Sequence, residues 1–236
     1  MSSFEHFSVD SPTGLGKWLT AKTVRQQFSY LLPCLPASRD IAILEIGPGR
    51  GEFAALFLDA GYRNYAIIEP DEGLRAVCEK LPIRRSYSSP IPPLPVGNAT
   101  QDLVIMCDVF EHMNDTAMAV AVIAEIKRVL IPGGMVFILC PDFMHWKEEF
   151  FNCDFSHSNP TTVRRTSQLF QNEGIETVSF AYHYTFLSGW LGLLIGAAVK
   201  LATSPFKALG ARNTSRIYRL RLCFLRRFLI LGKARS

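Results

Sequence analysis

The sequence predicts an α/β protein with a mostly parallel sheet. Between residues 40 and 184, short apolar, β-branched runs alternate with stretches of helical periodicity. The first apolar run, residues 41–46, breaks into a turn that holds Gly47, Gly49 and Gly51, and a helical pattern begins at Glu52. A strand, a glycine turn and a helix at the start of such a sheet are typical of a site for a nucleotide-like cofactor.

The glycine turn and the acid that follows it narrow the kind of ligand. Glycine accepts positive φ and, without a Cβ, lets a ligand lie against the backbone. The spacing is neither G-x-x-x-x-G-K-[ST] nor G-x-G-x-x-G, which excludes the two best-known phosphate-binding loops. Glu69 ends the next predicted strand, 22 residues after Gly47. An acid at this distance accepts hydrogen bonds from ribose hydroxyls in folds of this kind.

Length and cysteine content are those of one medium domain in a reducing compartment. The chain has 236 residues, enough for a sizeable core. Its six cysteines contain no C-x-x-C pair and several lie in apolar runs, so buried thiols fit better than disulfides or zinc, and we expect no metal. The first thirty residues hold no apolar segment, and we expect no signal peptide.

Periodicity and turn residues predict the remaining elements in order. A helix over 16–32, stopped by Pro33 and Pro36, precedes the first strand. The segment 108–112, D-V-F-E-H, is expected to open a helix at the end of the fourth strand. The other predicted helices are 52–60, 71–80, 117–130 and 167–172, and the other strands are 65–70, 83–87, 103–107, 135–140, 177–184 and 228–234.

Four sequence segments resemble one enzyme family. They are E-x-G-x-G-x-G over 45–51, the acid at 69, L-P-V-G-N-A-T-Q-D over 94–102 and L-I-P-G-G over 130–134. Together, over residues 40–145, they resemble class I S-adenosylmethionine-dependent methyltransferases of the type 11 group. That group includes ubiquinone- and menaquinone-pathway, phospholipid-base and surface-sugar methyltransferases. The resemblance implies a Rossmann-like, seven-stranded sheet with helices on both faces and an antiparallel last strand.

The resemblance also implies a cofactor and the residues that hold it. The cofactor is S-adenosylmethionine, and the matching positions are Glu45, Gly47, Pro48, Gly49, Gly51, Glu69, Pro70, Asp108 and Val109. The family usually has an acid after the third strand, near the adenine, but this chain has S-Y-S-S-P-I-P-P there. Adenine contacts would then come from residues 86–88 or from backbone amides.

The acceptor side is expected to carry histidines. Methyl transfer is an in-line displacement, and a hydroxyl acceptor also needs a base. His112 is the first candidate base, since some phospholipid-base members of the family use a histidine here, and His157 is the second; a structural role is the alternative for each. Tyr30, His145 and Trp146 are the candidate substrate contacts.

Charge divides the chain into two parts. Residues 177–236 hold ten basic residues and no acid, a charge of +10, whereas residues 1–176 carry 15 − 21 = −6. The most apolar stretch, 186–199, has fourteen residues, short of the ~20 that span a bilayer. An apolar helix with a basic flank predicts an interfacial element on an anionic membrane, formed by residues 186–227. A helical cap or dimer face is the alternative, and no nucleic-acid partner is expected.

These observations predict four segments and a function. The segments are 1–39, a helix that is either a lid or a packing element, 40–184, the methyltransferase core, 185–227, the apolar and basic insertion, and 228–236, the final strand. The function is methyl transfer to a small or lipid-linked acceptor, first at a hydroxyl oxygen. The alternatives are C- or N-methylation of a lipid- or quinone-type acceptor and a non-catalytic, methyltransferase-like binding protein. We expect the protein in the cytoplasm, peripherally on the inner face of the cell membrane.

Overall fold

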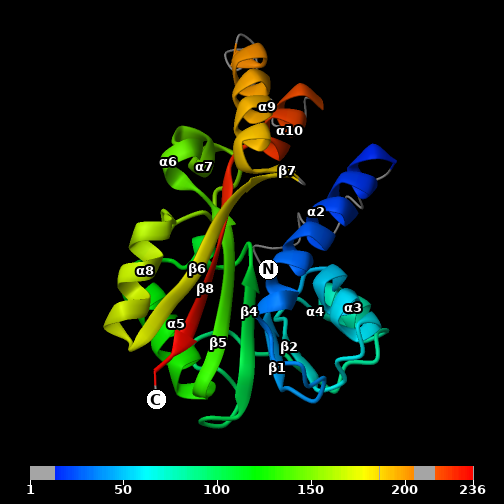
Figure 1. The fold of residues 1–236 in the computed structure, drawn as a ribbon, viewed down its shortest axis with the longest axis vertical. Helices are drawn as coiled ribbons and strands as arrows, with labels where there is room; N and C mark the ends of the chain where they lie inside the picture. The colour runs from blue at the N-terminus through cyan, green and yellow to red at the C-terminus, as the bar shows by residue number, and fades with distance from the viewer. Residues whose placement is uncertain (1–13, 186, 205–215, 236) are drawn as a thin grey trace.

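One eight-stranded sheet forms the centre of the molecule (Figure 1). The structure, a computed structural model, describes residues 14–185, 187–204 and 216–235. The strands are β1 (Ile43–Ile46), β2 (Tyr65–Ile68), β3 (Arg85–Tyr87), β4 (Gln101–Cys107), β5 (Leu130–Pro141), β6 (Ile175–Tyr184), β7 (Leu187–Ser188) and β8 (Arg227–Ala234).

The strand order is β3-β2-β1-β4-β5-β8-β6-β7. The first five strands in this order are parallel to their neighbours, and β8 is antiparallel to both β5 and β6. The chain therefore reverses its direction of travel across the sheet between β1 and β4, which is where ligands bind in open α/β sheets. The predicted α/β class and antiparallel final strand are confirmed. The expected number of seven strands was wrong, because the short β7 adds a strand by pairing with the end of β6.

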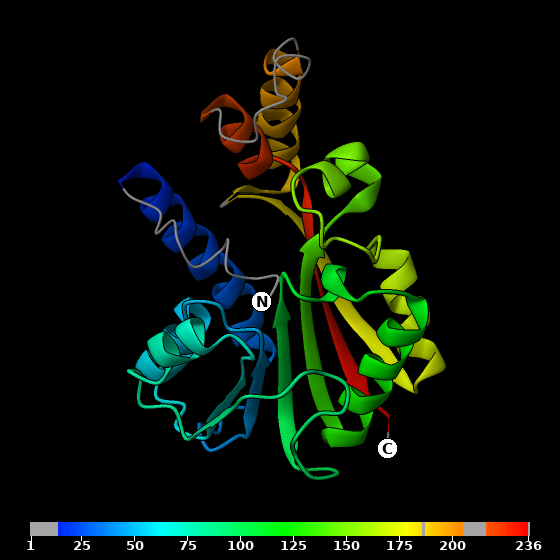
Figure 2. The same cartoon turned by 180° about the vertical axis from the view of Figure 1, so that it is seen from behind.

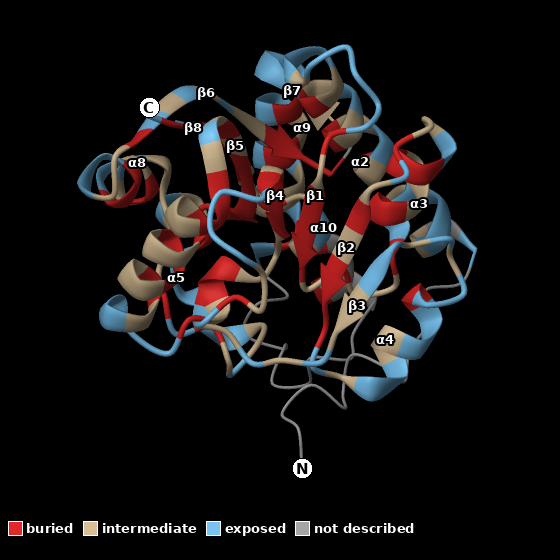
Figure 3. Ribbon diagram, turned by 90° about the horizontal axis from the view of Figure 1, so that it is seen from below, coloured by how far each residue is buried: buried red, intermediate tan, exposed pale blue. Residues whose placement is uncertain are grey.

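Helices cover both faces of the sheet (Figures 1 and 2). One face packs against α5 (Thr116–Val129) and α8 (Val163–Asn172), and the other packs against α2 (Leu15–Leu31) and α3 (Glu52–Asp59). The side chains of β1 alternate between the two faces of the sheet, as they do in any strand. Leu44 packs in the core beneath α5 and α8, and Ile43 packs in the core beneath α2 and α3. Figure 3 shows the buried strands in the middle and the exposed residues on the outer helices.

Helix α2 packs on the core through its C-terminal part. There the Phe28 ring meets Phe57 of α3 edge-on with centroids 5.0 Å apart, and Leu31 is fully buried. The N-terminal part of α2 extends beyond the end of β4 (Figure 1), and Trp18 there is 49% exposed. The predicted helix is confirmed, and residues 1–13 of the predicted N-terminal segment lie outside the described part.

Side-chain caps set where several helices begin. Asp71 accepts from Leu74 N at the start of α4 (Glu72–Cys78), and Asp115 accepts from Met118 N at the start of α5. Because Asp115 caps α5, that helix begins at Thr116 and the segment before it is separate. Residues Phe110–His112 form a separate 3₁₀ turn, η2, and His112 is its last residue. The helix expected to open at 108–112 is thus a single 3₁₀ turn, and His112 ends it instead of lying one turn into it.

The segment between β6 and β8 forms two helices beyond the carboxyl end of the sheet. Helix α9 (Gly189–Ala202) packs on the end of β6 through Gly192 and Gly196, where a Cβ would meet the Tyr184 ring at 2.9 and 2.5 Å. Helix α10 (Arg216–Cys223) is tied to the core by a buried ion pair, Arg221 Nε to Glu149 Oε1 at 3.0 Å. None of the described helices has the length and apolarity required to cross a membrane.

Candidate active site

The glycine turn after β1 is open toward the reversal point of the sheet. Gly47 has φ +66°, and a Cβ there would lie 2.5 Å from Val109 Cγ2, so only glycine fits beside the loop that follows β4. Gly49 has φ +56°, and a Cβ built on it meets nothing within 4 Å. Gly51 N donates to Pro48 O at 2.9 Å and closes the turn as α3 begins. The turn thus presents bare backbone at Gly49.

Glu69 holds the other side of the turn. It follows β2, is buried, and accepts hydrogen bonds from the backbone amides of Asp71, at 3.0 Å, and Gly49. Burial raises the pKa of Glu69, and the bond from Asp71 partly offsets this effect. The carboxylate is therefore fixed next to Gly49, where no side chain stands between the backbone and a ligand, and this arrangement suits a pair of acceptors for ribose hydroxyls. The carbonyl of the next residue, Pro70, accepts from Arg75.

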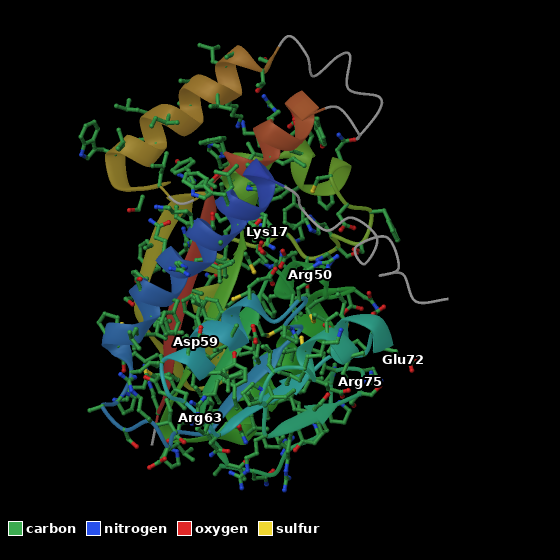
Figure 4. All side chains as sticks on the ribbon, turned by 90° about the vertical axis from the view of Figure 1, so that its right-hand side faces the viewer. Lys17, Arg50, Asp59, Arg63, Glu72 and Arg75 are labelled. Carbon is green, nitrogen blue, oxygen red and sulfur yellow. The ribbon has the colours of Figure 1, made fainter. Side chains whose placement is uncertain are left out.

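Glu45 lies beneath the turn rather than on its open side. It points into the α2–α3 core and accepts from the Tyr65 hydroxyl at 2.8 Å. Burial raises the pKa of this carboxyl to about 7, which the bond from Tyr65 partly offsets. Glu45 therefore supports the end of β1 from below. Figure 4 shows the same region from the side, with Arg50 at the upper end of α3 on the side of Lys17, and Asp59 and Arg63 at the opposite end.

Asp108 lies at the end of the strand between the glycine turn and the histidines. It follows β4 in a left-handed conformation, φ +55°, and its Oδ2 meets Arg227 Nη1 at 2.9 Å. Its other oxygen, Oδ1, is buried and has no hydrogen-bond partner within the described residues. Arg227 begins β8, two strands away from β4, so the ion pair crosses the end of β5. An orphaned buried acceptor at this position calls for a ligand donor.

His112 is held in one tautomer by a short hydrogen-bonded chain. Its Nδ1 lies 2.8 Å from Ser156 Oγ, and Ser156 Oγ lies 2.6 Å from Asp154 Oδ1. The carboxylate can only accept, so the single hydroxyl proton of Ser156 goes to Asp154 and His112 Nδ1 must donate to Ser156. The lone pair of His112 is then on Nε2. Burial is the main cause that lowers the pKa of His112, and the neighbouring His157 is the second. The ring is therefore neutral at pH 7.

His157 has the same arrangement and lies against His112. Its Nδ1 donates to the Phe150 carbonyl at 2.7 Å, which puts its lone pair on Nε2 as well. The two imidazole centroids are 4.8 Å apart with ring planes at 64°. Burial lowers the pKa of His157. The two predicted catalytic histidines, 45 positions apart in the sequence, are thus brought together on one side of Asp108.

The three predicted substrate contacts lie apart from this pair. On α6 (Phe143–Trp146), His145 Nδ1 accepts from Arg226 N at 3.2 Å and Trp146 Nε1 donates to Arg226 O at 2.7 Å. Burial, followed by Lys200, lowers the pKa of His145 to about 4. The Tyr30 hydroxyl donates to Ser179 Oγ at 3.1 Å, in the middle of β6. These contacts attach α6 and α2 to neighbouring strands.

Sequence reasoning missed the residues that organise the histidines and the acid. Asp154 and Ser156 form a D-x-S turn in which Ser156 N also donates to Asp154 Oδ1 at 2.9 Å, and this pattern was a usable signal for ordered backbone. Arg227 belongs to the ten basic residues of the C-terminal segment 177–236. Three of these ten, Arg221, Arg226 and Arg227, form ion pairs with Glu149, Asp142 and Asp108.

Comparison with known proteins decides what kind of domain carries this site. Residues 44–138 match the family model described as a methyltransferase domain, of type 11. These residues are a type 11 methyltransferase domain. A curated protein of Mycolicibacterium gilvum (strain PYR-GCK), described as an uncharacterized methyltransferase, is 30% identical over 109 residues, 43% of this chain. The match spans only 40% of that relative's length.

Solved structures of low sequence identity share the overall fold of this chain. The protein solved in complex with the Haloferax volcanii Trm112 methyltransferase activator gives a TM-score of 0.71 at 15% identity, covering 100% of this chain and 99% of that one. A geranyl diphosphate methyltransferase in complex with S-adenosylmethionine gives 0.66 at 14%, covering 98% and 95%. An S-adenosylmethionine-dependent methyltransferase of Archaeoglobus fulgidus gives 0.63 at 16%, covering 90% and 94%.

The cofactor of the methyltransferase domain is S-adenosylmethionine, and the site fits it. Bare backbone at Gly49 and the fixed carboxylate of Glu69 suit the ribose end, and the orphaned Oδ1 of Asp108 suits a donor of the cofactor. On β3, where the usual family acid is absent, Ser86 Oγ is likewise buried without a partner among the described residues.

Proposed function

We propose that this protein transfers a methyl group from S-adenosylmethionine to a hydroxyl of a small or lipid-linked acceptor, with His112 as the base. One observation carries the proposal. The open glycine turn with Glu69 and the tautomer-locked His112 flank Asp108 at the same carboxyl edge of the sheet. A cofactor on one side of Asp108 and an acceptor on the other would have their reacting atoms face to face, as an in-line displacement requires.

In this reaction one set of residues binds the cofactor and another removes the proton. Glu69 and the backbone of Gly49 orient the cofactor, which supplies an electrophilic methyl group on its sulfonium when bound. Nε2 of His112 accepts the hydroxyl proton as the acceptor oxygen forms its bond to carbon and the carbon–sulfur bond breaks. Ser156 and Asp154 keep Nδ1 protonated, so that Nε2 is the basic atom throughout.

Methylation at nitrogen or carbon is the second reaction class, and it makes a different demand on His112. A neutral amine attacks with its own lone pair and needs no base before the methyl group moves. Oxygen acceptors without activation are poorer nucleophiles, so a built-in base favours oxygen. The His112–Ser156–Asp154 chain is therefore the observation that favours O-methylation over N-methylation.

The membrane part of the proposal rests mainly on exposed apolar side chains of α9. Trp190, Leu194 and Leu201 recur at positions i, i+4 and i+11, so they share one helical face, and they are 73, 58 and 77% exposed. The opposite face, with Gly192 and Gly196, packs on Tyr184. We infer that the outer face of α9 inserts at the surface of an anionic bilayer and brings lipid-linked acceptors to the site.

Charge contributes less to this contact than the sequence suggests. Arg221, Arg226 and Arg227 are paired within the protein. Lys233 and Arg235 lie at the far end of β8, by the C-terminus (Figure 1). Of the others, residues 207 and 212 lie outside the described residues. At about 1 kcal/mol for each near-surface basic residue, electrostatic attraction would assist an apolar contact but not replace it.

Two measurements test the function. Calorimetry with S-adenosylhomocysteine should detect binding, and no binding at high micromolar concentration would leave only the non-catalytic alternative. Transfer of labelled methyl from S-adenosylmethionine should then be followed with matched alcohol- and amine-bearing lipids presented in anionic vesicles. Incorporation into amines with none into alcohols would overturn the O-methylation proposal while leaving the methyltransferase standing.

A further inference from the structure

Three groups with metal-binding chemistry meet beside Asp108. Glu111 and His112 come from η2 and His157 comes from the loop after α7 (Glu148–Asn152). Each offers one ligand atom, and these atoms all lie within 4.8 Å of one another. The spacing of the three residues in the sequence gives no recognised metal motif, and no metal was expected here. Only the fold assembles the set.

Both imidazoles are oriented as metal ligands usually are. A metal-ligating histidine almost always donates its other ring N–H to a carbonyl, carboxylate or similar acceptor. His157 donates from Nδ1 to the Phe150 carbonyl at 2.7 Å, and His112 donates from Nδ1 to Ser156, itself bonded to Asp154. Each ring is thereby held in the tautomer that carries its lone pair on Nε2.

Glu111 is the buried carboxyl of the cluster. It is 1% exposed, and its Oε2 accepts from the Cys140 thiol at 3.5 Å, a weak bond because a thiol is a poor donor. Its own backbone amide and the positive charge of Arg227, whose ion pair is with Asp108, also act on this carboxyl. A buried carboxyl in this position is stabilised by a proton or by a metal ion.

We propose that Glu111, His112 and His157 bind one divalent cation of the zinc class, and that this ion inhibits methyl transfer by occupying Nε2 of His112. Two imidazoles and one carboxylate suit Zn²⁺ or Co²⁺, whereas Mg²⁺ and Ca²⁺ prefer oxygen ligands alone. Metal–ligand distances of about 2.0–2.2 Å require the ligand atoms to approach by roughly 1.5 Å at most. Rotation of the Glu111 side chain would supply this movement. The inhibitory half rests on the proposed role of His112.

Binding is tested first, without reference to activity. The full chain with C34S and C223S, which removes the two exposed thiols, is stripped with chelator and titrated with ZnCl₂. We expect each chain to bind one Zn²⁺, and we expect E111Q and H157Q each to weaken this binding at least about tenfold. H145Q is the matched control, since His145 lies on α6 outside the cluster, and it should bind as the parent does. Unchanged binding in both cluster variants would overturn the site.

A second readout needs no substitution in the cluster. Co²⁺ bound by imidazole nitrogen and carboxylate gives visible bands distinct from those of the hydrated ion, and a spectrum of hydrated Co²⁺ at excess protein would also overturn the site. For inhibition, methyl transfer should fall with the same Zn²⁺ midpoint as binding and recover with chelator. Stoichiometric Zn²⁺ binding with undiminished transfer would overturn inhibition and retire His112 as the base, but leave both the metal site and the methyltransferase intact.

Discussion

The Nδ1 atom of His112 donates to the hydroxyl of Ser156, 2.8 Å away and 44 positions later in the chain. Because the Ser156 hydroxyl donates its hydrogen to Asp154, this bond fixes Nε2 as the nitrogen of His112 that carries the lone pair. In the proposed reaction the same bond orients His112 as the base. It also makes the role of Ser156 testable separately from that of His112.

Ser156→Ala should lower kcat roughly tenfold to a hundredfold with little change in KM for S-adenosylmethionine, because the base loses its orientation while the cofactor side is untouched. Ser156→Thr keeps the hydroxyl and should recover most of kcat.

His112→Ala should bind cofactor normally and lose at least about a hundredfold in turnover. Near-normal turnover of H112A, measured by methyl incorporation, would show that His112 is not the base.

Gly49→Val should weaken S-adenosylhomocysteine binding by at least about a hundredfold, because the side chain fills the space beside the bare backbone. The matched control is Gly61→Val. Gly61 also has positive φ, +93°, and nothing within 4 Å of a built Cβ, but it ends α3 away from the turn. Both variants carry the backbone strain, so calorimetry separates strain from blocked binding. Equal loss of binding in the two would contradict the proposed cofactor position.

Glu45→Gln should change how stability depends on pH. The folded-state pKa of Glu45, about 7, lies above the ordinary value of 4.5 for a glutamate. Between pH 4.5 and pH 7 the Glu45 carboxyl ionises in the unfolded chain but stays protonated in the folded one. The free energy of unfolding therefore falls as pH rises through this range, by roughly 3 kcal/mol in all. Above pH 7 the carboxyl is ionised in both states, and this group lowers the stability no further. Urea denaturation at pH 4.5 and pH 8 should show a smaller decrease for E45Q than for the parent, and parallel decreases would refute the assignment.

The outer face of α9 should control binding to vesicles. Replacing Trp190, Leu194 and Leu201 by Ser removes side chains worth about 1.5–3 kcal/mol each when buried in an apolar phase, so flotation with anionic vesicles should weaken at least about a hundredfold. Val178 and Phe180, 54 and 51% exposed on β6, give the control pair. If V178S/F180S lowers binding as much as the α9 triple variant does, α9 is not the membrane contact.

The buried ion pair of α10 should be needed for stability. Arg221 and Glu149 side chains are 5 and 2% exposed, so Arg221→Met leaves a buried carboxylate unpaired and should destabilise the fold by roughly 3–5 kcal/mol. Replacing both residues by Met should recover much of this loss. Glu79→Gln breaks a more exposed pair with Arg75, 3.7 Å apart, and should change stability by less than about 1 kcal/mol. Chemical denaturation measures all three.

Most of the fold was predictable because local patterns carry it. Strand β1, the glycine turn and α3 follow from an apolar run, residues that accept positive φ and a helical repeat, which are properties of neighbouring residues. The distance from Gly47 to Glu69 is also local, since one βαβ unit separates them. The methyltransferase domain and its cofactor side were therefore within reach of the sequence.

Only the tertiary structure brings the two histidines together with their hydrogen-bond partners. His112, Ser156 and His157 come from separate segments, and their hydrogen bonds fix tautomers that no periodicity encodes. Arg221, Arg226 and Arg227 look like one basic tail in the sequence, yet the fold pairs each with an acid from elsewhere. The reason is physical: short-range patterns record burial and backbone conformation, whereas charge pairing and proton positions depend on atoms that only the packed chain brings within about 3 Å.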